Sequence, residues 1–285
     1  MAETVSVMEA LNLDLGWPSY QENMVERWQG NQHTLQLDFI AEEVPVSLVY
    51  NGTPHVVMLV TPTNLEEFAL GFSITEGIID SPKELLATRV YNRSNGIEVH
   101  CQIPAERFSC LAEKGRNLSG RTGCGLCGAS TLQQAVRKPG PVKASLTLSA
   151  TELLSSLAEL NRHQQLNQLT GSVHAAAWAI PGQGIVELRE DVGRHNALDK
   201  LIGLLLKTGR NFAEGFVIIT SRASFEMIQK AAFVGISLLA AVSAPTGLAI
   251  RLADETGLTL IGFARKDQYV VYTHSDRLTH STFLI

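Results

Sequence analysis

The sequence has few cysteines and few charges: four cysteines in 285 residues, and 18% charged residues. So few thiols in a chain of this length do not suggest a disulfide scaffold, which favours a reducing compartment. The net charge of −5 argues against a broad basic surface for nucleic acid. No apolar run reaches the roughly 18 residues that indicate a membrane-spanning helix. We therefore expect a cytoplasmic protein that binds neither nucleic acid nor membrane.

The first residues do not indicate export. They carry Glu3, Glu9 and Asp14 and lack the basic n-region of a secretory signal. Residues 1–30 are polar, and we expect an irregular N-terminal segment there. Because 45% of the chain is apolar, the remainder can form a sizeable core.

Residues 31–118 have the pattern of a β-rich domain. Alternating apolar residues at 44–60 surround Asn51-Gly52, a dipeptide typical of hairpin turns. A second run of this kind, at 90–103, surrounds Asn95-Gly96. We expect two β-hairpins in this part.

Two capping boxes predict the starts of helices. Thr63-Asn64-Leu65-Glu66 predicts a helix to about Glu76, and Ser149-Ala150-Thr151-Glu152 predicts a helix to about Gln168.

Residues 146–285 alternate between strand and helix patterns. Such alternation predicts a largely parallel sheet between layers of helices. The fold class is therefore α/β, with the smaller α+β, β-rich domain before it and a linker at 119–145. We expect strands at 184–189, 216–220, 258–264 and 269–273, and helices at 196–207, 223–241 and 247–255.

The linker holds a Cys-x-x-Cys pair, Cys124 and Cys127. It lies within Gly120–Gly128, nine residues with four glycines. Glycine this dense disfavours a regular helix or strand, so we expect an accessible loop. The cation of Arg121 favours the thiolate, which is the reactive form of cysteine. A thioredoxin-like pair would normally lie at the start of a helix that follows a strand. A loop that carries sulfur is therefore a better interpretation of this segment than a disulfide exchanger.

Zinc binding is an alternative for the same thiols. A structural zinc needs four ligands. Cys101 and Cys110 are expected to be buried as small apolar side chains. The remaining candidate zinc ligands are Cys124, Cys127, His174 and His195. A zinc deaminase would carry a His-x-Glu motif, whereas alanines follow His174.

A first candidate ligand site is the strand-to-helix junction at Ser221-Arg222-Ala223-Ser224. The N-terminus of a helix offers free N–H groups and a partial positive charge, both of which favour phosphate. Arg222 can bind phosphate through two parallel hydrogen bonds. The alternative is that Ser221 only caps the helix.

A second junction, Asp191–Asn196, places an acid, an arginine and a histidine where open α/β sheets bind ligands. The alternative is a structural hydrogen bond between His195 and Asp191.

The last candidate is the polar turn between the two final strands. Arg265 and Lys266 could bind phosphate, Phe263 could stack on a base, and Asp267 could accept from the amino edge of guanine. The alternative is an ordinary hairpin turn.

Together these segments resemble the FdhD family of formate dehydrogenase accessory sulfurtransferases. The matching stretches are Gly120–Gly128, Thr170–Ala177, Asp191–Gly203, Ser221–Ala232, Ser243–Thr246 and Thr259–Arg265. The resemblance implies a fold similar to that of the cytidine deaminases, with three layers. Lys266-Asp267-Gln268 stands where members often carry glycine and a further arginine, and Ser172 replaces a frequent glycine.

The resemblance also implies a function. A cysteine desulfurase would place a persulfide on Cys124, with Cys127 assisting. The sulfur would then pass to the molybdenum cofactor, Mo-bis(molybdopterin guanine dinucleotide), before its insertion into formate dehydrogenase. The cofactor, or GDP as its analogue, would bind at Phe263, Ala264, Arg265, Lys266, Asp267, Gln268, Ser221 and Arg222. Its two guanine nucleotides suit a homodimer with two equal sites. The alternatives are a non-catalytic cofactor chaperone and a zinc-binding regulatory protein.

Overall fold

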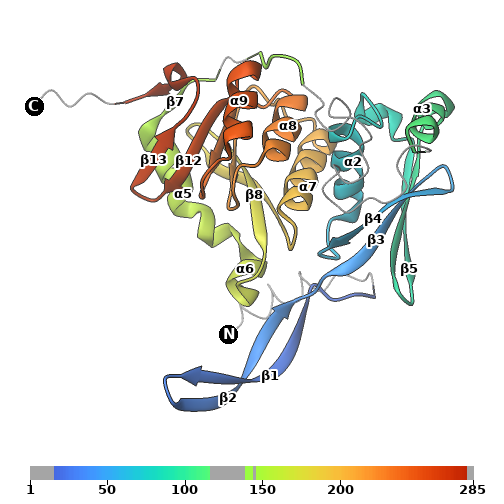
Figure 1. Ribbon diagram of the computed structural model, residues 1–285, viewed down its shortest axis with the longest axis horizontal. Helices are drawn as coiled ribbons and strands as arrows, with labels where there is room; N and C mark the ends of the chain where they lie inside the picture. Colours follow the sequence, from blue (N-terminus) through green and yellow to red (C-terminus); the bar gives the residue numbers. More distant parts are fainter. Residues whose placement is uncertain (1–15, 116–138, 144–145, 281–285) are drawn as a thin grey trace, which may run out of the picture.

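The structure is a computed structural model, and it describes residues 16–115, 139–143 and 146–280. A smaller β-rich part and a larger α/β part lie side by side, with helices α2 and α7 between their sheets (Figure 1). None of the helices in these ranges is long and apolar enough to cross a membrane.

The smaller part is a four-stranded sheet with helix α2 on one face. Both predicted hairpins are confirmed, since β3 pairs antiparallel with β4, and β5 with β6. Residues of β3 such as Val46 and Leu48 form one apolar core with Phe68 and Phe72 of α2. The elements are β3 (Val44–Tyr50), β4 (Thr53–Val60), α2 (Leu65–Thr75), a 3-10 turn (Pro82–Glu84), β5 (Ala87–Arg93), β6 (Gly96–Gln102) and α3 (Ala105–Gly115), and the strand order is β4-β3-β6-β5.

The helix predicted after Thr63 is confirmed as α2, but its capping box is not. The residue before the helix is Asn64, which has φ 54° and makes no side-chain capping bond. The hydroxyl oxygen of Thr63 instead accepts a hydrogen bond from Lys200 Nζ at 3.4 Å. The Thr63 side chain thus contacts the other part of the molecule and does not cap α2.

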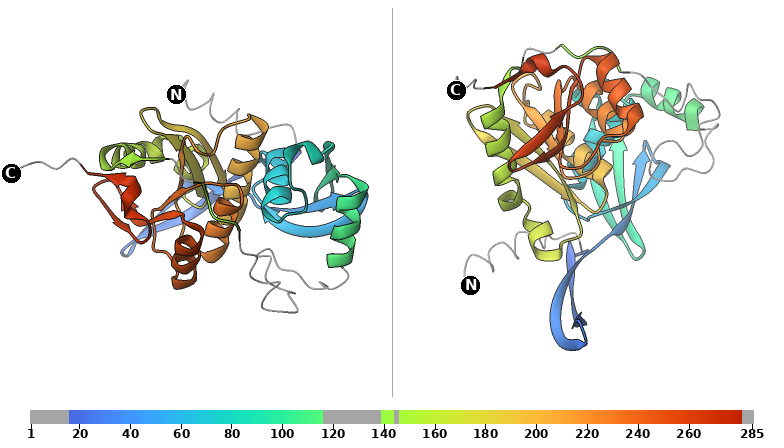
Figure 2. Two further views of the ribbon diagram at one scale, coloured as in Figure 1. Left: turned by 90° about the horizontal axis from the view of Figure 1, so that it is seen from above. Right: turned by 60° about the vertical axis from the view of Figure 1, so that its left-hand side comes forward.

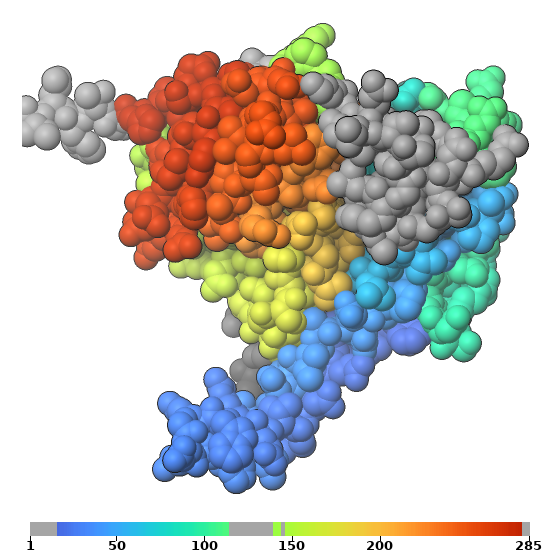
Figure 3. All heavy atoms as spheres, in the orientation of Figure 1, coloured from blue at the N-terminus to red at the C-terminus, as the bar shows by residue number. Residues whose placement is uncertain are grey.

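An arm extends from the molecule below the larger part (Figures 1 and 3). It is the hairpin of β1 (Tyr20–Gln29) and β2 (Gln32–Ala41), which pair along their full length. The expectation that residues 1–30 are irregular is therefore wrong from Tyr20 onward. Polar side chains occupy both faces of β1, such as Glu22 on one and Asn23 on the other, so no clear alternation marked the strand.

The larger part is a six-stranded sheet in the order β13-β12-β11-β10-β8-β9. Only β10-β11 and β11-β12 are parallel, and the other neighbours are antiparallel. The prediction of a largely parallel sheet is thus wrong. Both ends of the sheet are hairpins, whose short turns permit only antiparallel pairing. The strands are β8 (His174–Ile180), β9 (Gly184–Asp191), β10 (Phe216–Ile219), β11 (Leu238–Ala241), β12 (Thr259–Arg265) and β13 (Gln268–Val271).

The single helix predicted at 223–241 is also wrong. Helix α8 covers only Phe225–Phe233, and the chain turns at Gly235 with φ 85°. It then returns as the buried strand β11. A short, fully apolar run does not distinguish a buried strand from a buried helix.

Helices cover both faces of this sheet, which confirms the three-layer α/β fold (Figure 2). On one face lie α7 (Arg194–Lys207), α8 and α9 (Gly247–Thr256), and on the other lies α5 (Ala150–His163). The capping box of α5 at Ser149 is confirmed. The helix ends earlier than expected, at His163, and α6 (Gln165–Thr170) follows. Two short strands, β7 (Leu148–Ser149) and β14 (Leu278–Thr279), and a 3-10 turn (Ser275–Arg277) complete the part.

The two parts meet at a glycine contact between α2 and α7. A Cβ atom on Gly71 would lie 1.8 Å from the Asp199 carbonyl oxygen, and one on Gly203 would lie 1.8 Å from that of Glu67. Only glycine allows the two backbones to approach this closely.

Two buried lysines also join the parts. Lys200 Nζ lies 2.7 Å from Asp191 Oδ2 and donates to the carbonyl oxygen of Thr61 at 2.9 Å. Lys230 Nζ lies 2.9 Å from Asp199 Oδ2 and 2.8 Å from Glu76 Oε1. Because a buried charge without partners is strongly unfavourable, these contacts fix how the two parts sit against each other.

Candidate functional site

Three loops meet at one edge of the six-stranded sheet. They follow the parallel strands β10, β11 and β12, whose carboxyl ends share that edge. The backbone N–H of Thr246 donates to the Ala223 carbonyl at 3.0 Å, and that of Phe263 donates to the Ser243 carbonyl at 3.2 Å. These bonds join the loop at Ser221–Ser224, through Ser243–Thr246, to Phe263. We call this group of loops the carboxyl-edge site.

The structure therefore brings together the two predicted cofactor segments. Ser221 and Arg222 follow β10, while Phe263–Gln268 closes the hairpin of β12 and β13. Strand β11 lies between β10 and β12, so the two segments are linked through the loop at Ser243–Thr246.

Phe263 has an unusual backbone conformation. Its φ is 49°, in the left-handed region that bulky residues rarely adopt. The pairing of β12 with β13 is irregular between Gly262 and Arg265, and Phe263 remains 38% exposed while Ala264 is buried. Strained residues of this kind are concentrated at ligand sites.

The junction before α8 differs in detail from the prediction. The N-cap is Ser224, not Ser221, and its hydroxyl donates to Glu226 Oε2 at 2.7 Å instead of capping the helix. The buried hydroxyl of Ser221 donates to the carbonyl of Arg222 at 3.1 Å. Arg222 is exposed and has no ion pair with the residues described. Its guanidinium is thus available to an anion.

Asp191 has a structural role, not a ligand-binding one. It is fully buried, and its carboxylate accepts hydrogen bonds from the backbone N–H of Thr61 at 3.0 Å and of Gly193 at 2.8 Å. Asn196 Nδ2 donates to it at 2.9 Å, and Lys200 forms an ion pair with it. The predicted alternative, a bond from His195 to Asp191, is therefore wrong.

His195 lies next to Glu226 instead. The distance from Nε2 to Oε2 is 3.8 Å, which is too long for a hydrogen bond. The neighbouring His195, with the hydroxyl of Ser224, lowers the pKa of Glu226 to about 2 against the opposing effect of burial. Sequence reasoning missed Glu226, because its contact with His195 depends on how α7 packs against α8.

Two buried nitrogen atoms at the start of α7 lack hydrogen-bond acceptors among the residues described. They are Arg194 Nε and His195 Nε2. Burial, and then the nearby Arg194 cation, lower the pKa of His174 at the start of β8. Near the carboxyl-edge site, Arg194 and His195 thus present nitrogen atoms to which an anionic ligand could supply acceptors.

The predicted thiol pair, Cys124 and Cys127, lies outside the described residues. Of the other two cysteines, Cys101 is buried as expected, and burial raises its pKa to about 12. Cys110 is exposed on α3, so the expectation that it is buried is wrong. Within the described ranges, no three His, Cys, Asp or Glu side chains are arranged to hold a metal ion.

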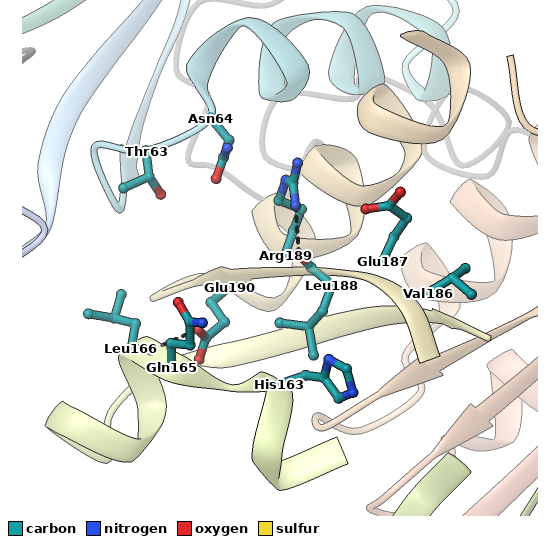
Figure 4. Close-up of a pocket in the computed structure, with 10 residues that line it drawn as sticks. All are labelled: Thr63, Asn64, His163, Gln165, Leu166, Val186, Glu187, Leu188, Arg189 and Glu190. Atoms are coloured by element: carbon teal, nitrogen blue, oxygen red, sulfur yellow. Dashed lines mark hydrogen bonds between the residues drawn. The ribbon is translucent and has the colours of Figure 1, made fainter. Parts of the chain in front are cut away.

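A separate hollow of about 300 Å³ lies along β9, the edge strand of the sheet (Figure 4). None of the predicted site residues lines it. Charged groups that line it already have partners. The Glu190 carboxylate accepts hydrogen bonds from the backbone N–H groups of Leu166 and Asn167, both at 2.8 Å. Arg189 forms an ion pair with Glu67 at 2.6 Å. This hollow therefore offers less to a ligand than the carboxyl-edge site.

Comparison with known proteins places these features in context. The family model described as FdhD/NarQ matches residues 41–279. A protein of Cupriavidus necator named sulfur carrier protein FdhD is 46% identical over 94% of this chain and 93% of its own length. One of the same name from Xanthomonas campestris is 49% identical over 89% and 90%. A crystal structure of a proposed formate dehydrogenase accessory protein from Desulfotalea psychrophila matches 92% of this chain and all of that one, with a TM-score of 0.71 and 22% identity, which supports the fold.

Proposed function

This chain belongs to the FdhD/NarQ family, and from that membership we propose that it is a sulfur carrier for the maturation of formate dehydrogenase. Its place of action would be the cytoplasm, where thiols are kept reduced. The structural observation that supports the proposal is the carboxyl-edge site, because it joins a free arginine, an exposed aromatic ring and the N-terminus of α8. Such a combination suits a nucleotide.

The sulfur would be carried by Cys124. A cysteine desulfurase would transfer sulfur to its thiolate and leave a persulfide. The Cys127 thiolate would then attack the inner sulfur, forming a disulfide with Cys124, while the outer sulfur leaves as sulfide with the electron pair of the broken bond. A cellular dithiol would reduce the disulfide and restore both thiols. Cys124 is essential to this chemistry, whereas another thiol could replace Cys127 as the releasing nucleophile, so Cys127→Ala should do milder damage. The chemistry would make the protein a sulfurtransferase.

The acceptor would be Mo-bis(molybdopterin guanine dinucleotide), bound as a substrate. Arg222, Arg265 and Lys266 would hold its phosphates, with Ser221 at the same junction. Phe263 would stack on guanine and Asp267 would accept from its amino edge, while Ala264 and Gln268 would complete the turn. Because the acceptor has two guanine nucleotides, we propose that two copies of the chain bind it together.

Persulfide loading tests the sulfur-carrier role. Incubation with a cysteine desulfurase and cysteine should add about one sulfur mass to the protein, and a reductant should remove it. Cys124→Ala should abolish this addition and leave formate dehydrogenase synthesised but inactive. Cys110→Ala is the matched control, since Cys110 is exposed but lies in α3, and it should load normally. Full formate dehydrogenase activity with Cys124→Ala would instead favour a non-catalytic chaperone.

Nucleotide binding tests the acceptor site. Calorimetry should show that GDP binds more tightly than ADP, and Asp267→Asn should remove the difference. Arg222→Ala should weaken GDP binding about tenfold, as expected for the loss of a charge-assisted hydrogen bond. Arg27→Ala, which removes an exposed arginine of the arm, should not change it. Persulfide loading should remain normal in Arg222→Ala; its loss in a folded variant would contradict the assignment of Arg222 to the acceptor.

A further inference from the structure

The arm formed by β1 and β2 has one apolar face. The register places Met24 opposite Leu37, Glu26 opposite Leu35, and Trp28 opposite His33. Side chains of paired residues lie on the same side of a sheet, so the even-numbered residues of β1 and the odd-numbered residues of β2 share one face. We call this the apolar arm face.

Within the part of the chain that the structure describes, only the base of this face is packed against other elements. There, Tyr20 and Phe39 pack with Leu166 and Val173 of the larger part. Farther out, the same face is open to solvent: Met24 is 64% exposed, Trp28 60%, Leu35 68% and Leu37 49%.

This exposure has an energetic consequence. A two-stranded hairpin is marginally stable in water unless its apolar face is covered. A contiguous group of exposed apolar side chains is typical of an interaction surface. The outer half of the apolar arm face therefore needs a partner.

The geometry points to a second copy of this chain as that partner. The four-stranded sheet carries α2 on one side, and its other side, which we call the outer sheet face, exposes Val57 (58%) and Leu59 (52%). Two sheets that each have an apolar face commonly pack face to face. The apolar arm face of one copy could therefore pack against the outer sheet face of another.

Charge supports this choice of surface. The apolar arm face carries the carboxylates of Glu22 and Glu26 and no lysine or arginine. On the outer sheet face, Arg93 is paired with Glu98 at 2.8 Å, and Arg89 adds one further positive charge; these residues alternate with the inward-facing Val90 and Val99. Packing of one arm on another arm would instead oppose like charges.

The arm cannot reach the outer sheet face of its own chain. It runs below the larger part and away from the four-stranded sheet (Figure 1). A two-fold arrangement, in which each arm lies on the outer sheet face of the other copy, repeats one contact twice and closes the assembly. This inference rests on the pairing of two copies proposed above, and it does not depend on sulfur transfer.

Light scattering and sedimentation of the full-length protein test the arrangement. The wild-type chain should be a dimer, and Leu35→Glu and Leu59→Glu should each raise its dissociation constant at least about tenfold, because each would bury an unpaired carboxylate. Ile40→Glu is the matched control. Ile40 is 43% exposed on the opposite side of the arm, and its substitution should leave the dimer intact.

Mixing the two defective variants gives a sharper result. The arm of Leu59→Glu and the outer sheet face of Leu35→Glu are both unaltered, so the mixture should form heterodimers through one intact contact. Arm-on-arm packing would give no such rescue, and its absence would overturn the proposal. A monomeric wild type, or a dimer unaffected by Leu35→Glu or by Leu59→Glu, would also overturn it. Persulfide loading, measured on the same samples, reports separately on the sulfur-carrier role.

Discussion

His195 and Glu226 come from different helices, and their proximity sets a charge state that neither sequence segment suggests alone. The pKa of Glu226 is lowered to about 2, first by His195 and then by Ser224. The carboxylate therefore stays charged at any physiological pH. It lies beside His195, which follows Arg194 at the start of α7, close to the carboxyl-edge site.

The same pair makes a prediction about stability and pH. Because the pKa of Glu226 is lower in the folded protein than its usual 4.5, its contribution to stability is present above about pH 4.5 and is lost as the pH falls towards 2. Glu226→Gln should lower the free energy of unfolding by about 2 kcal/mol near neutral pH, which is less than the full pKa shift implies because the pair is partly exposed.

Urea unfolding at a series of pH values measures this effect. The difference between wild type and Glu226→Gln should shrink between about pH 4.5 and pH 2. Glu66→Gln is the control, since its ion pair with Lys207 is 56% exposed on both sides and should contribute little at any pH. A pH-independent difference for Glu226→Gln would show that the carboxylate is not stabilised by its neighbours.

At the scale of elements, α5 shows how local sequence alone can determine the start of a helix. Ser149 Oγ accepts from the backbone N–H of Glu152 at 3.2 Å, and the Glu152 carboxylate accepts from the backbone N–H of Ser149 at 3.0 Å. These two bonds satisfy two N–H groups that a helix would otherwise leave unpaired. They also fix the direction of the helix that covers one face of the large sheet.

Ser149→Ala should therefore lower the free energy of unfolding by about 1 kcal/mol. Ser155→Ala, in the exposed interior of the same helix, should change it by less than about 0.5 kcal/mol. Denaturant unfolding of both variants measures the difference. Equal effects would mean that the capping bonds contribute nothing to stability.

Where local signals were strong, the sequence predicted the elements correctly. Asn-Gly turns marked both hairpins of the small sheet, and Ser149 marked α5. The errors fall where packing decides. Strand β8 is rich in alanine, a strong helix former, and was not predicted, because burial in a sheet overrides intrinsic preference. One helix was predicted over residues 223–241, where the structure has α8 and then β11. The two elements could not be separated, because β11 is as apolar as α8.

The candidate site divides in the same way. Ser221, Arg222 and Phe263 were proposed because turns and helix starts have local signatures, although the helix start lies at Ser224 and their contact with a ligand stays a prediction. The role of Asp191 was not, since its partner Thr61 lies 130 residues away in the chain. Glu226 was missed for the same reason. Residues whose role depends on long-range contacts give no local pattern.

At the scale of the whole molecule, the close approach of α2 and α7 makes the two parts one packed unit. Gly203→Ala would place a methyl group 1.8 Å from the Glu67 carbonyl oxygen, so the helices must separate. The free energy of unfolding should fall by about 3 kcal/mol.

Gly140→Ala is the control for this change. No atom lies within 4 Å of the position of its Cβ, and its φ is not in the left-handed region, so its stability should be within about 0.5 kcal/mol of wild type. Thermal and denaturant unfolding measure both variants. If Gly203→Ala were as stable as Gly140→Ala, the backbone contact between the helices would not be as tight as described.

The buried lysines also bear on how the chain could be divided. A fragment that ended before the larger part would remove Lys230 from Glu76, and one that began after the smaller part would leave Lys200 without the Thr61 carbonyl. Each fragment would expose the glycine surface of one helix to water. We therefore expect that neither part folds when it is expressed alone, and that the two parts unfold together as a single unit.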